Sequence, residues 1–175
     1  MKVTLYMAMT ANGMIATEND DTSWVSPTEW KSFRSMIHKA GNMILGRRTY
    51  EVMLRNKEFS KLGKVKVVVV STKLKTNKNI TVVESPAEAL SFLQREGFSQ
   101  ALVCGGGKLN SSFMKEKLID EIYLDVEPIV LGKGIKLFTD ANFEAKLELM
   151  GIKKLSKDEV QMQYKVKKVN TGKFK

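Results

Sequence analysis

Disulfide partners and soft metal ligands are almost absent from this sequence. It has one cysteine, Cys104, and one histidine, His38, among 175 residues. A lone cysteine excludes an intramolecular disulfide, and this pair is too few for a Cys/His zinc site, so we expect no structural metal. Catalysis by a Ser-His-Asp or Cys-His set is disfavoured too, because His38 lies in a helical stretch without a nucleophile in a recognisable turn. An enzyme of this composition would depend on a bound cofactor.

Long apolar runs are also missing. No apolar stretch is long enough to cross a bilayer, and the N-terminus lacks a basic segment followed by an apolar signal core, which predicts a soluble, cytoplasmic protein. The length and the 43% hydrophobic content are those of one domain, and neither an internal repeat nor a linker interrupts the chain. We expect one domain over residues 1–169 and a loose tail over 170–175.

Negative charge is in short supply. Lys and Arg number 29 and Asp and Glu 19, which gives a formal net charge of +10. This excess favours anionic partners, but it does not say which ones. The lysines are dispersed along the chain, and dispersed charge is typical of a solvated surface.

Hydrophobic periodicity predicts strands that alternate with helices. The predicted strands cover residues 2–9, 42–45, 64–70, 80–83, 101–104, 119–126 and 129–131, followed by a hairpin over 145–155 and 159–169. The predicted helices cover residues 27–39, 49–54, 86–96 and 108–117, and two of them begin with a Ser-Pro-x-Glu capping box. This order indicates a mainly parallel α/β sheet with an antiparallel C-terminal edge.

Phosphate-binding chemistry follows several of the predicted strands. Gly105-Gly106-Gly107 joins a strand to a helix, where unobstructed backbone N–H groups favour a phosphate. Gly46-Arg47-Arg48-Thr49 places two guanidinium groups and a hydroxyl at a second such junction, and Ser71-Thr72-Lys73 follows a third strand. Ligands in open α/β sheets bind at the carboxyl ends of strands, so these segments can converge on one long anion.

These motifs occur in the order seen in the dihydrofolate-reductase-like superfamily, which residues 3–138 resemble. Ala8 and the 15–19 segment resemble the first strand and the loop over the nicotinamide, and Trp24, Pro27 and Glu29 resemble the entry to the substrate-binding helix. The segment 45–51 is similar to the family's cofactor-phosphate signature. The resemblance implies a three-layer fold with helices on both faces of the sheet, and NADPH as cofactor.

The resemblance also assigns candidate site residues. It implies cofactor contacts at Ala8, Ile15, Gly46, Arg47, Arg48, Thr49, Ser71, Thr72, Gly105, Gly106, Gly107, Lys108 and Leu109. It implies substrate contacts at Trp24, Glu29, Phe33 and Tyr123, with Glu29 as the catalytic carboxylate and the 11–23 loop as a lid.

Two segments resemble one branch of the superfamily, the reductase domain of riboflavin biosynthesis. They are 10–16, similar to that branch's Ser-x-Asp-Gly-x-Ile-Ala opening, and 127–134, similar to its proline-to-double-glycine segment. Asn12 stands where the branch typically has aspartate. The resemblance implies hydride transfer to a ribosylaminopyrimidine phosphate, with dihydrofolate reduction as the alternative. It also implies a homodimer.

Several residues have a structural interpretation beside the functional one. Glu29 closes a capping box with Ser26 and could only cap its helix. Tyr123 and Trp24 could be packing residues, while Cys104 and His38 are expected to be an inert core residue and an ordinary helix-end residue. For the whole protein, the other classes are a basic nucleic-acid-binding protein, motivated by charge alone, and a silent relative that binds a nucleotide without turnover.

Overall fold

The structure is a computed structural model that describes residues 1–139 and 141–167. Its main sheet has the order β5-β4-β3-β6-β1-β7-β10-β9. The strands are β1 (Lys2–Thr10), β3 (Asn42–Gly46), β4 (Lys66–Val70), β5 (Thr81–Val83), β6 (Gln100–Val103), β7 (Glu121–Glu127), β9 (Lys146–Lys154) and β10 (Val160–Lys167). Every pairing from β5 to β7 is parallel, and β10 pairs antiparallel with both β7 and β9.

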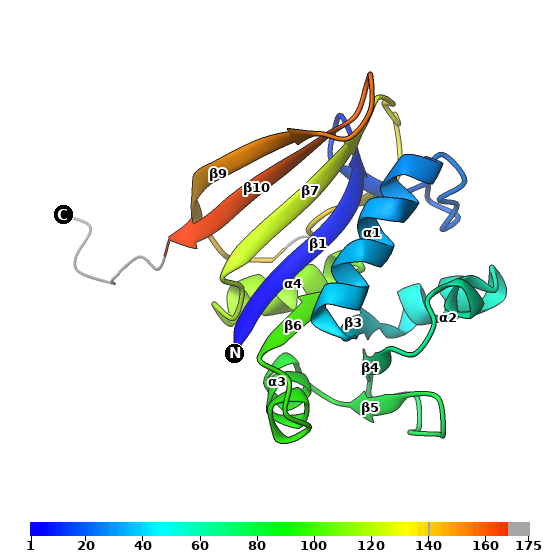
Figure 1. Cartoon of the computed structure of the whole chain (residues 1–175), viewed down its shortest axis with the longest axis vertical. Coiled ribbons are helices and arrows are strands. Elements are labelled where there is room, and N and C mark those ends of the chain that lie inside the picture. Colours follow the sequence, from blue (N-terminus) through cyan, green and yellow to red (C-terminus); the bar gives the residue numbers. More distant parts are fainter. Residues whose placement is uncertain (140, 168–175) are drawn as a thin grey trace.

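Helices cover both faces of this sheet (Figure 1). On one face, α1 (Pro27–Ala40), α2 (Arg47–Arg55) and the 3-10 turn η1 (Glu58–Lys61) pack on a core that includes Tyr6, Met43 and Leu45. On the other face, α3 (Pro86–Arg95) and α4 (Gly107–Lys115) pack on a core that includes Leu5 and Ile44. Successive residues of β1 and β3 therefore point into opposite cores, which explains the nearly continuous apolar runs of these strands.

The predicted α/β architecture is confirmed, including the helices on both faces and the antiparallel edge hairpin of β9 and β10. Bounds shift by one or two residues, most clearly at α2, which begins at Arg47 rather than Thr49. The proposed tail, residues 170–175, lies outside the described residues. No helix within 1–139 and 141–167 combines the length and apolarity that a membrane span requires.

One predicted strand is wrong. Residues 129–131 form no strand, and the extended segment lies later, as β8 (Ile135–Lys136), which pairs antiparallel with β2 (Met14–Ala16) in a separate two-stranded sheet. The side chain of Asn12 bonds to the backbone of this predicted strand at Leu131. Its Nδ2 donates to the Leu131 carbonyl at 2.7 Å, and its Oδ1 accepts from the Leu131 N–H at 3.2 Å. These side-chain bonds replace strand pairing at Leu131.

Candidate active site

A cavity of about 670 Å³ opens at the carboxyl ends of β1, β3, β4 and β6. The junctions that follow β3 and β6 are joined directly, because the Gly46 N–H donates to the Gly105 carbonyl at 2.8 Å. The loop after β4 reaches the same cavity with Ser71, Thr72 and Lys73. The three segments with phosphate-binding groups therefore meet at one cavity, because the carboxyl ends of parallel strands lie at the same edge of a sheet.

Two of the helices that open onto this cavity lack a side-chain cap. The N-caps of α2 and α4 are Gly46 and Gly106, and neither has a side chain to bond the first-turn N–H groups. By contrast, Ser26 and Ser85 cap α1 and α3 with their hydroxyls. The uncapped N–H groups carry the positive ends of their helix dipoles to the cavity, where an anionic ligand can satisfy them.

Close packing requires the glycines of the loop after β6. Gly105 has φ +90°, and a Cβ there would lie 2.8 Å from the Met7 sulfur. A Cβ at Gly107 would lie 2.5 Å from the Lys136 carbonyl oxygen, inside any permitted contact. Glycine lets the backbone approach both the sheet and the cavity at this point.

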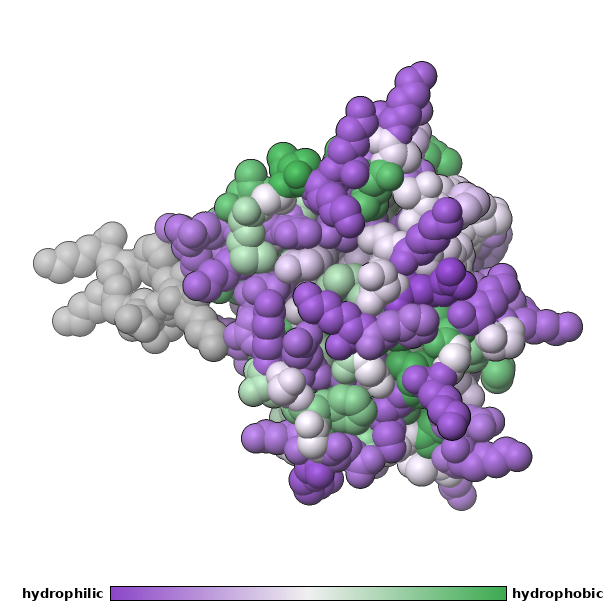
Figure 2. All heavy atoms as spheres, viewed as in Figure 1, coloured by the Kyte–Doolittle hydropathy of each residue, from purple (hydrophilic) through white to green (hydrophobic). Residues whose placement is uncertain are grey.

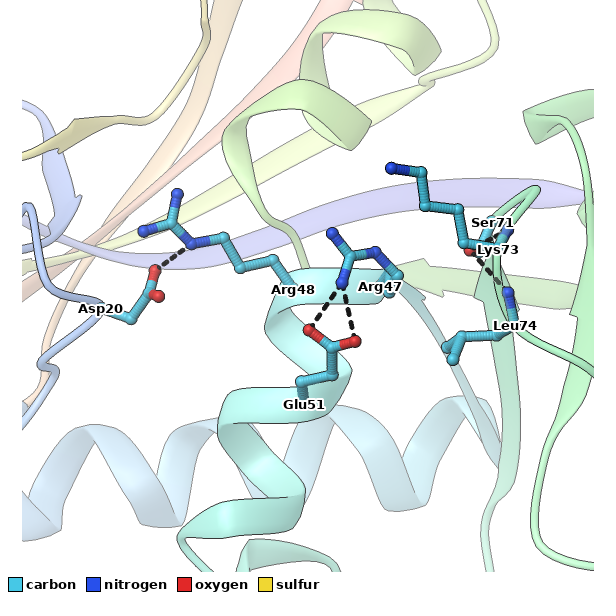
Figure 3. A network of polar contacts seen from close by, with 7 residues as sticks. All are labelled: Asp20, Arg47, Arg48, Glu51, Ser71, Lys73 and Leu74. Carbon is cyan, nitrogen blue, oxygen red and sulfur yellow. Dashed lines mark hydrogen bonds and ion pairs between the residues drawn. The ribbon is translucent and has the colours of Figure 1, made fainter.

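Cations come from the first turn of α2 and from the neighbouring strand ends. Arg48 extends from this turn toward the 17–23 loop, where its Nε lies 2.6 Å from Asp20 (Figure 3). Arg47 pairs with Glu51 through one nitrogen, at 2.8 and 2.9 Å, and Ser71 and Lys73 lie on its other side (Figure 3). The Arg47–Glu51 pair is exposed on both sides, and in the second pair Arg48 is exposed while Asp20 is partly buried. Ion pairs at the surface contribute only about 0 to 1 kcal/mol, so a phosphate can replace the Glu51 carboxylate at little cost.

The opposite part of the cavity is apolar and contains one buried acid. Trp30, Phe33 and Met53 line it, and the Phe33 ring stacks on Tyr6 with centroids 5.6 Å apart. Glu29 also lines the cavity and is 4% exposed. Burial, reinforced by the negative charge of Asp125, raises the pKa of Glu29 to about 8, so this carboxyl keeps its proton at neutral pH.

The capping interpretation of Glu29 is right for its backbone and wrong for its side chain. The Glu29 N–H donates to Ser26 Oγ at 3.0 Å, as in a capping box. The other half of the box comes from Glu127 of β7, whose Oε1 accepts the Ser26 N–H at 2.8 Å. The Glu29 side chain can therefore turn inward, where the Tyr6 hydroxyl lies 3.3 Å from its Oε1.

Most of the predicted site residues are brought together in this cavity. Its wall includes Ala8, Ile15, Gly46, Arg47, Arg48, Thr49, Ser71, Thr72, Gly106, Gly107, Lys108 and Leu109 from the cofactor set. It also includes Glu29 and Phe33 from the substrate set. Gly105 is not part of the wall, although its two chain neighbours, Cys104 and Gly106, both line the cavity.

Two predicted substrate contacts lie elsewhere. Tyr123 stands opposite Tyr6 in the strand register but faces a small recess with Lys2, Met36 and Glu121, away from the cavity. Trp24 is partly buried outside the cavity wall, and its neighbour Val25 lines the cavity instead. No sequence signal identified Trp30 or Tyr6 as wall residues, because a tyrosine on a strand and a tryptophan on a helix usually serve packing.

The fold and the site together define an α/β protein of the dihydrofolate-reductase-like fold, with a nucleotide-sized cavity at the carboxyl edge of its parallel strands. Residues 1–160 match the model of the RibD C-terminal domain family. This chain therefore belongs to that family, as its sequence motifs predicted. Among the described residues, no three His, Cys, Asp or Glu side chains gather into a group that could hold a metal ion.

Its relatives and structural neighbours agree with this assignment. YwjB of Bacillus subtilis (strain 168), an uncharacterised protein, is 34% identical over 169 residues, covering 93% of this chain and 97% of YwjB. A protein assigned to riboflavin biosynthesis in Shewanella sp. PV-4 superposes with a TM-score of 0.82 at 22% identity, covering 95% of this chain and 99% of that one.

A longer neighbour has a second region that this chain does not match. The Thermotoga maritima diaminohydroxyphosphoribosylaminopyrimidine deaminase/5-amino-6-(5-phosphoribosylamino)uracil reductase superposes with a TM-score of 0.71 at 19% identity. The superposition covers 94% of this chain but only 56% of the Thermotoga protein.

Proposed function

We propose that this chain is an NADPH-dependent reductase that reduces a carbon–nitrogen double bond of a nitrogen heterocycle. The observation that carries the proposal is one cavity with phosphate-ready helix ends in one part and a buried, protonated carboxyl in another. NADPH, when bound, supplies the hydride. The chain then has to supply one proton, and Glu29 is the acid positioned to donate it to the substrate nitrogen.

The cofactor would lie across the strand ends. The N–H groups at the start of α4 would take its diphosphate, while Arg47, Arg48 and Thr49 at the start of α2 would take the phosphate on its adenosine ribose, with Ser71 and Thr72 alongside. The Ser71 Oγ already accepts the Lys73 N–H at 3.0 Å, which leaves its own hydrogen to donate to a phosphate oxygen. Within the 11–23 segment that was expected to form a lid, β2 (Met14–Ala16) is paired with β8. The proposed lid is therefore the remaining 17–23 loop, which is tied to Arg48 through Asp20.

The first candidate substrate is a ribosylaminopyrimidine phosphate, reduced at C1′ in its open, Schiff-base form. Membership of the RibD C-terminal domain family supports it, and the net charge of +10 suits a phosphorylated substrate. Its phosphate would need one of the cations that line the cavity, which include Arg47, Arg48, Lys73 and Lys108.

The second candidate is a dihydropteridine, and a specific observation favours it. The part of the wall around Glu29 is formed by Trp30, Phe33, Val52 and Met53, an apolar surface suited to a flat ring with an apolar extension. The lining cations belong to the strand-end junctions rather than to this apolar wall.

Ligand-dependent melting tests the cofactor. At about 100 times its Kd, NADPH is expected to stabilise the protein by roughly 2.7 kcal/mol. NADH at the same concentration is expected to stabilise it by less. Arg47→Ala and Arg48→Ala should reduce the shift with NADPH more than the shift with NADH. Arg55→Ala is the matched control, since Arg55 is an exposed arginine at the far end of the same helix. No shift with either nucleotide, together with salt-dependent retention of RNA, would support the nucleic-acid-binding alternative instead.

Turnover of the two substrates separates the candidates. NADPH oxidation is followed with dihydrofolate and with the ribosylaminopyrimidine phosphate, and Glu29→Gln is expected to abolish whichever reaction occurs. Retained turnover in Glu29→Gln would remove Glu29 from the chemistry. Cofactor binding without oxidation on any heterocycle would instead identify a silent relative.

A homodimer is also proposed, and the C-terminal hairpin supports it. β9 is an edge strand of the main sheet, and Leu147, Leu149, Met150 and Ile152 on it are exposed. An unpaired edge with exposed apolar side chains is a surface that proteins normally cover. Light scattering of the purified protein gives the mass in solution, and a monomer across the micromolar range would refute the dimer.

A further inference from the structure

A row of buried polar side chains continues from Glu29 into the sheet. The Tyr6 hydroxyl of β1 lies 3.3 Å from Glu29 Oε1 and 2.5 Å from Asp125 Oδ2 of β7. Tyr6 and Glu29 line the cavity, whereas Asp125 lies behind them and is 1% exposed. One hydroxyl therefore stands between two carboxyls, in a place almost closed to solvent.

The single hydroxyl hydrogen of Tyr6 can go to only one of these carboxyls. Asp125 is the nearer acceptor, and it has a second donor: Gln161 Nε2 bonds its Oδ1 at 2.7 Å. The Gln161 amide is itself oriented, because Gln163 Nε2 donates to its Oε1 at 2.6 Å. Within the described residues, Tyr6 is the only hydrogen-bond partner of the Glu29 carboxyl.

A buried negative charge needs hydrogen-bond donors. The two carboxyls differ in the number of donors that reach them, and this difference decides which of them holds the charge. Asp125 has the donors that an ionised carboxylate requires, and Glu29 does not. A Tyr6 hydroxyl that donates to Asp125 presents its oxygen to Glu29, and that oxygen can be bonded only by a carboxyl that still carries its proton.

We propose that Asp125 and Tyr6 are positioning residues for the acid of this site: Asp125 holds the Tyr6 hydrogen, and Tyr6 thereby accepts the proton of Glu29 and keeps that carboxyl neutral. The inference rests on the proposed function only for the use of Glu29 in a reaction. The hydrogen-bonded row itself is a property of the free protein.

The charges around Glu29 support the same distribution. Like Asp125, Glu127 of β7 and Glu159, which precedes β10, raise the pKa of Glu29 through their negative charge. The buried Cys104 thiol lies near Glu29 at the end of β6. Lys153 of β9 lowers the pKa of Asp125 through its positive charge, which favours ionisation of Asp125. Burial raises the pKa of Asp125, but the bonds from Tyr6, Gln161 and Ser32 oppose that shift.

The test measures the Glu29 pKa directly in the protein without substrate or cofactor. Carboxyl carbons of glutamate are labelled with ¹³C, the Glu29 resonance is assigned with Glu29→Gln, and its titration is followed by NMR. Asp125→Asn removes the charge and lets the Tyr6 hydroxyl turn to Glu29, so the Glu29 pKa should fall by about one unit or more. An unchanged or higher value would overturn the proposal.

Tyr6→Phe is a second test, which does not require the Asp125 variant to fold. The two possible directions of the Tyr6–Glu29 hydrogen bond predict opposite shifts of the Glu29 pKa in this variant. If Tyr6 accepts the Glu29 proton, its loss destabilises the neutral acid and lowers the Glu29 pKa. If Tyr6 donated to Glu29 instead, the same variant would raise it, which refutes the inference. Glu127→Gln is the matched control, because it removes a neighbouring charge on β7 and its amide oxygen can still accept the Ser26 N–H. Its effect should be smaller than that of Asp125→Asn, and an equal effect would mean that charge alone explains the shift.

These results stand apart from the proposed function. If the protein neither binds NADPH nor reduces a heterocycle, the same titration of Glu29 is still expected. Where turnover is found, Asp125→Asn should move the basic limb of the kcat/KM profile to lower pH while preserving the rate on the acid side. A uniform loss of rate at every pH would show Asp125 to be merely structural.

Discussion

Cys104 shows how one buried residue can lie at a site without taking part in its chemistry. Its side chain contributes to the cavity wall but is 5% exposed, and the thiol hydrogen is directed to the Leu102 carbonyl at 3.8 Å. Burial, with the nearby Glu29, raises the pKa of the thiol far above its usual range. We predict that iodoacetamide alkylates native Cys104 slowly at pH 8, and that the unfolded protein reacts at the rate of an ordinary thiol. Mass spectrometry over time measures both rates, and equal rates would contradict the burial of this side chain.

Glu29 marks the limit of sequence interpretation at the scale of one residue. The Ser26–Glu29 spacing correctly predicts the start of α1 and the bond from the Glu29 N–H to Ser26. It could not predict where the carboxyl points. The Ser26 N–H bonds instead to Glu127, which lies 101 positions after Ser26 in the chain. Local patterns describe bonds within one turn, whereas the pKa of Glu29 depends on side chains from two strands, β1 and β7, and from the loop before β10. Tyr123 lies outside the cavity wall for a related reason: strand alternation assigns it a face of the sheet, but not a position along the strand relative to the cavity.

Elements with strong local signals were predictable, and those formed by distant pairing were not. The capping boxes at Ser26 and Ser85 and the β-branched run before Ser71 locate α1, α3 and β4 to within a few residues. The sheet of β2 and β8 has no such signal, because each is very short and pairs with a partner more than a hundred residues away. The 129–131 run resembled a strand by composition, but Asn12 satisfies the backbone of Leu131 with its side chain.

The small sheet nevertheless fixes the start of α4. The Lys136 carbonyl and Thr139 pack against Gly107, so that a Cβ at this position would lie 2.5 Å from a backbone oxygen. We predict that Gly107→Ala destabilises the protein by about 2 kcal/mol, although alanine is favoured over glycine by roughly 1 kcal/mol within a helix. Urea unfolding measures the difference. Gly132→Ala is the control, because a methyl group added there would have nothing within 4 Å and φ at Gly132 is not positive.

A stability loss in Gly107→Ala that matches Gly132→Ala would show that β8 yields to the added methyl. A large loss confined to Gly107 would show that the two-stranded sheet is a rigid boundary of the cavity. In that case NADPH-dependent stabilisation should fall as well, because displacement of Gly107 moves the uncapped N–H groups of α4.

Across the whole molecule, positive charge dominates the surface while several carboxyl groups are buried. The face in view in Figure 2 is largely hydrophilic, with smaller hydrophobic areas between the polar side chains. This agrees with the dispersed lysines that the sequence predicted as a solvated surface. The interior instead holds Glu29, Asp125 and Glu127, and burial is the leading cause that raises the pKa of each of these groups.

These buried carboxyls make the stability of the protein depend on pH in a direction opposite to that of a protein with salt-bridged acids. When a carboxyl pKa is higher in the folded than in the unfolded state, the folded state binds more protons between the two values, so stability falls as pH rises. For Glu29 the window runs from about 4.5, its usual value, to about 8. We predict that the free energy of unfolding decreases across this window, by on the order of 3 kcal/mol for Glu29.

Glu29→Gln should flatten that decrease, since a neutral amide carries no proton to lose. The variant is expected to be more stable than the wild type at pH 8.5 and to lose this advantage by pH 5, as measured by urea unfolding at a series of pH values. Glu144→Gln, which removes an exposed carboxylate, controls for the change in net charge and should leave the slope of the wild type intact. If Glu29→Gln retained the full slope, the Glu29 carboxyl would be ionised at neutral pH, and the protein would lack the proton source on which its proposed reduction of a heterocycle depends.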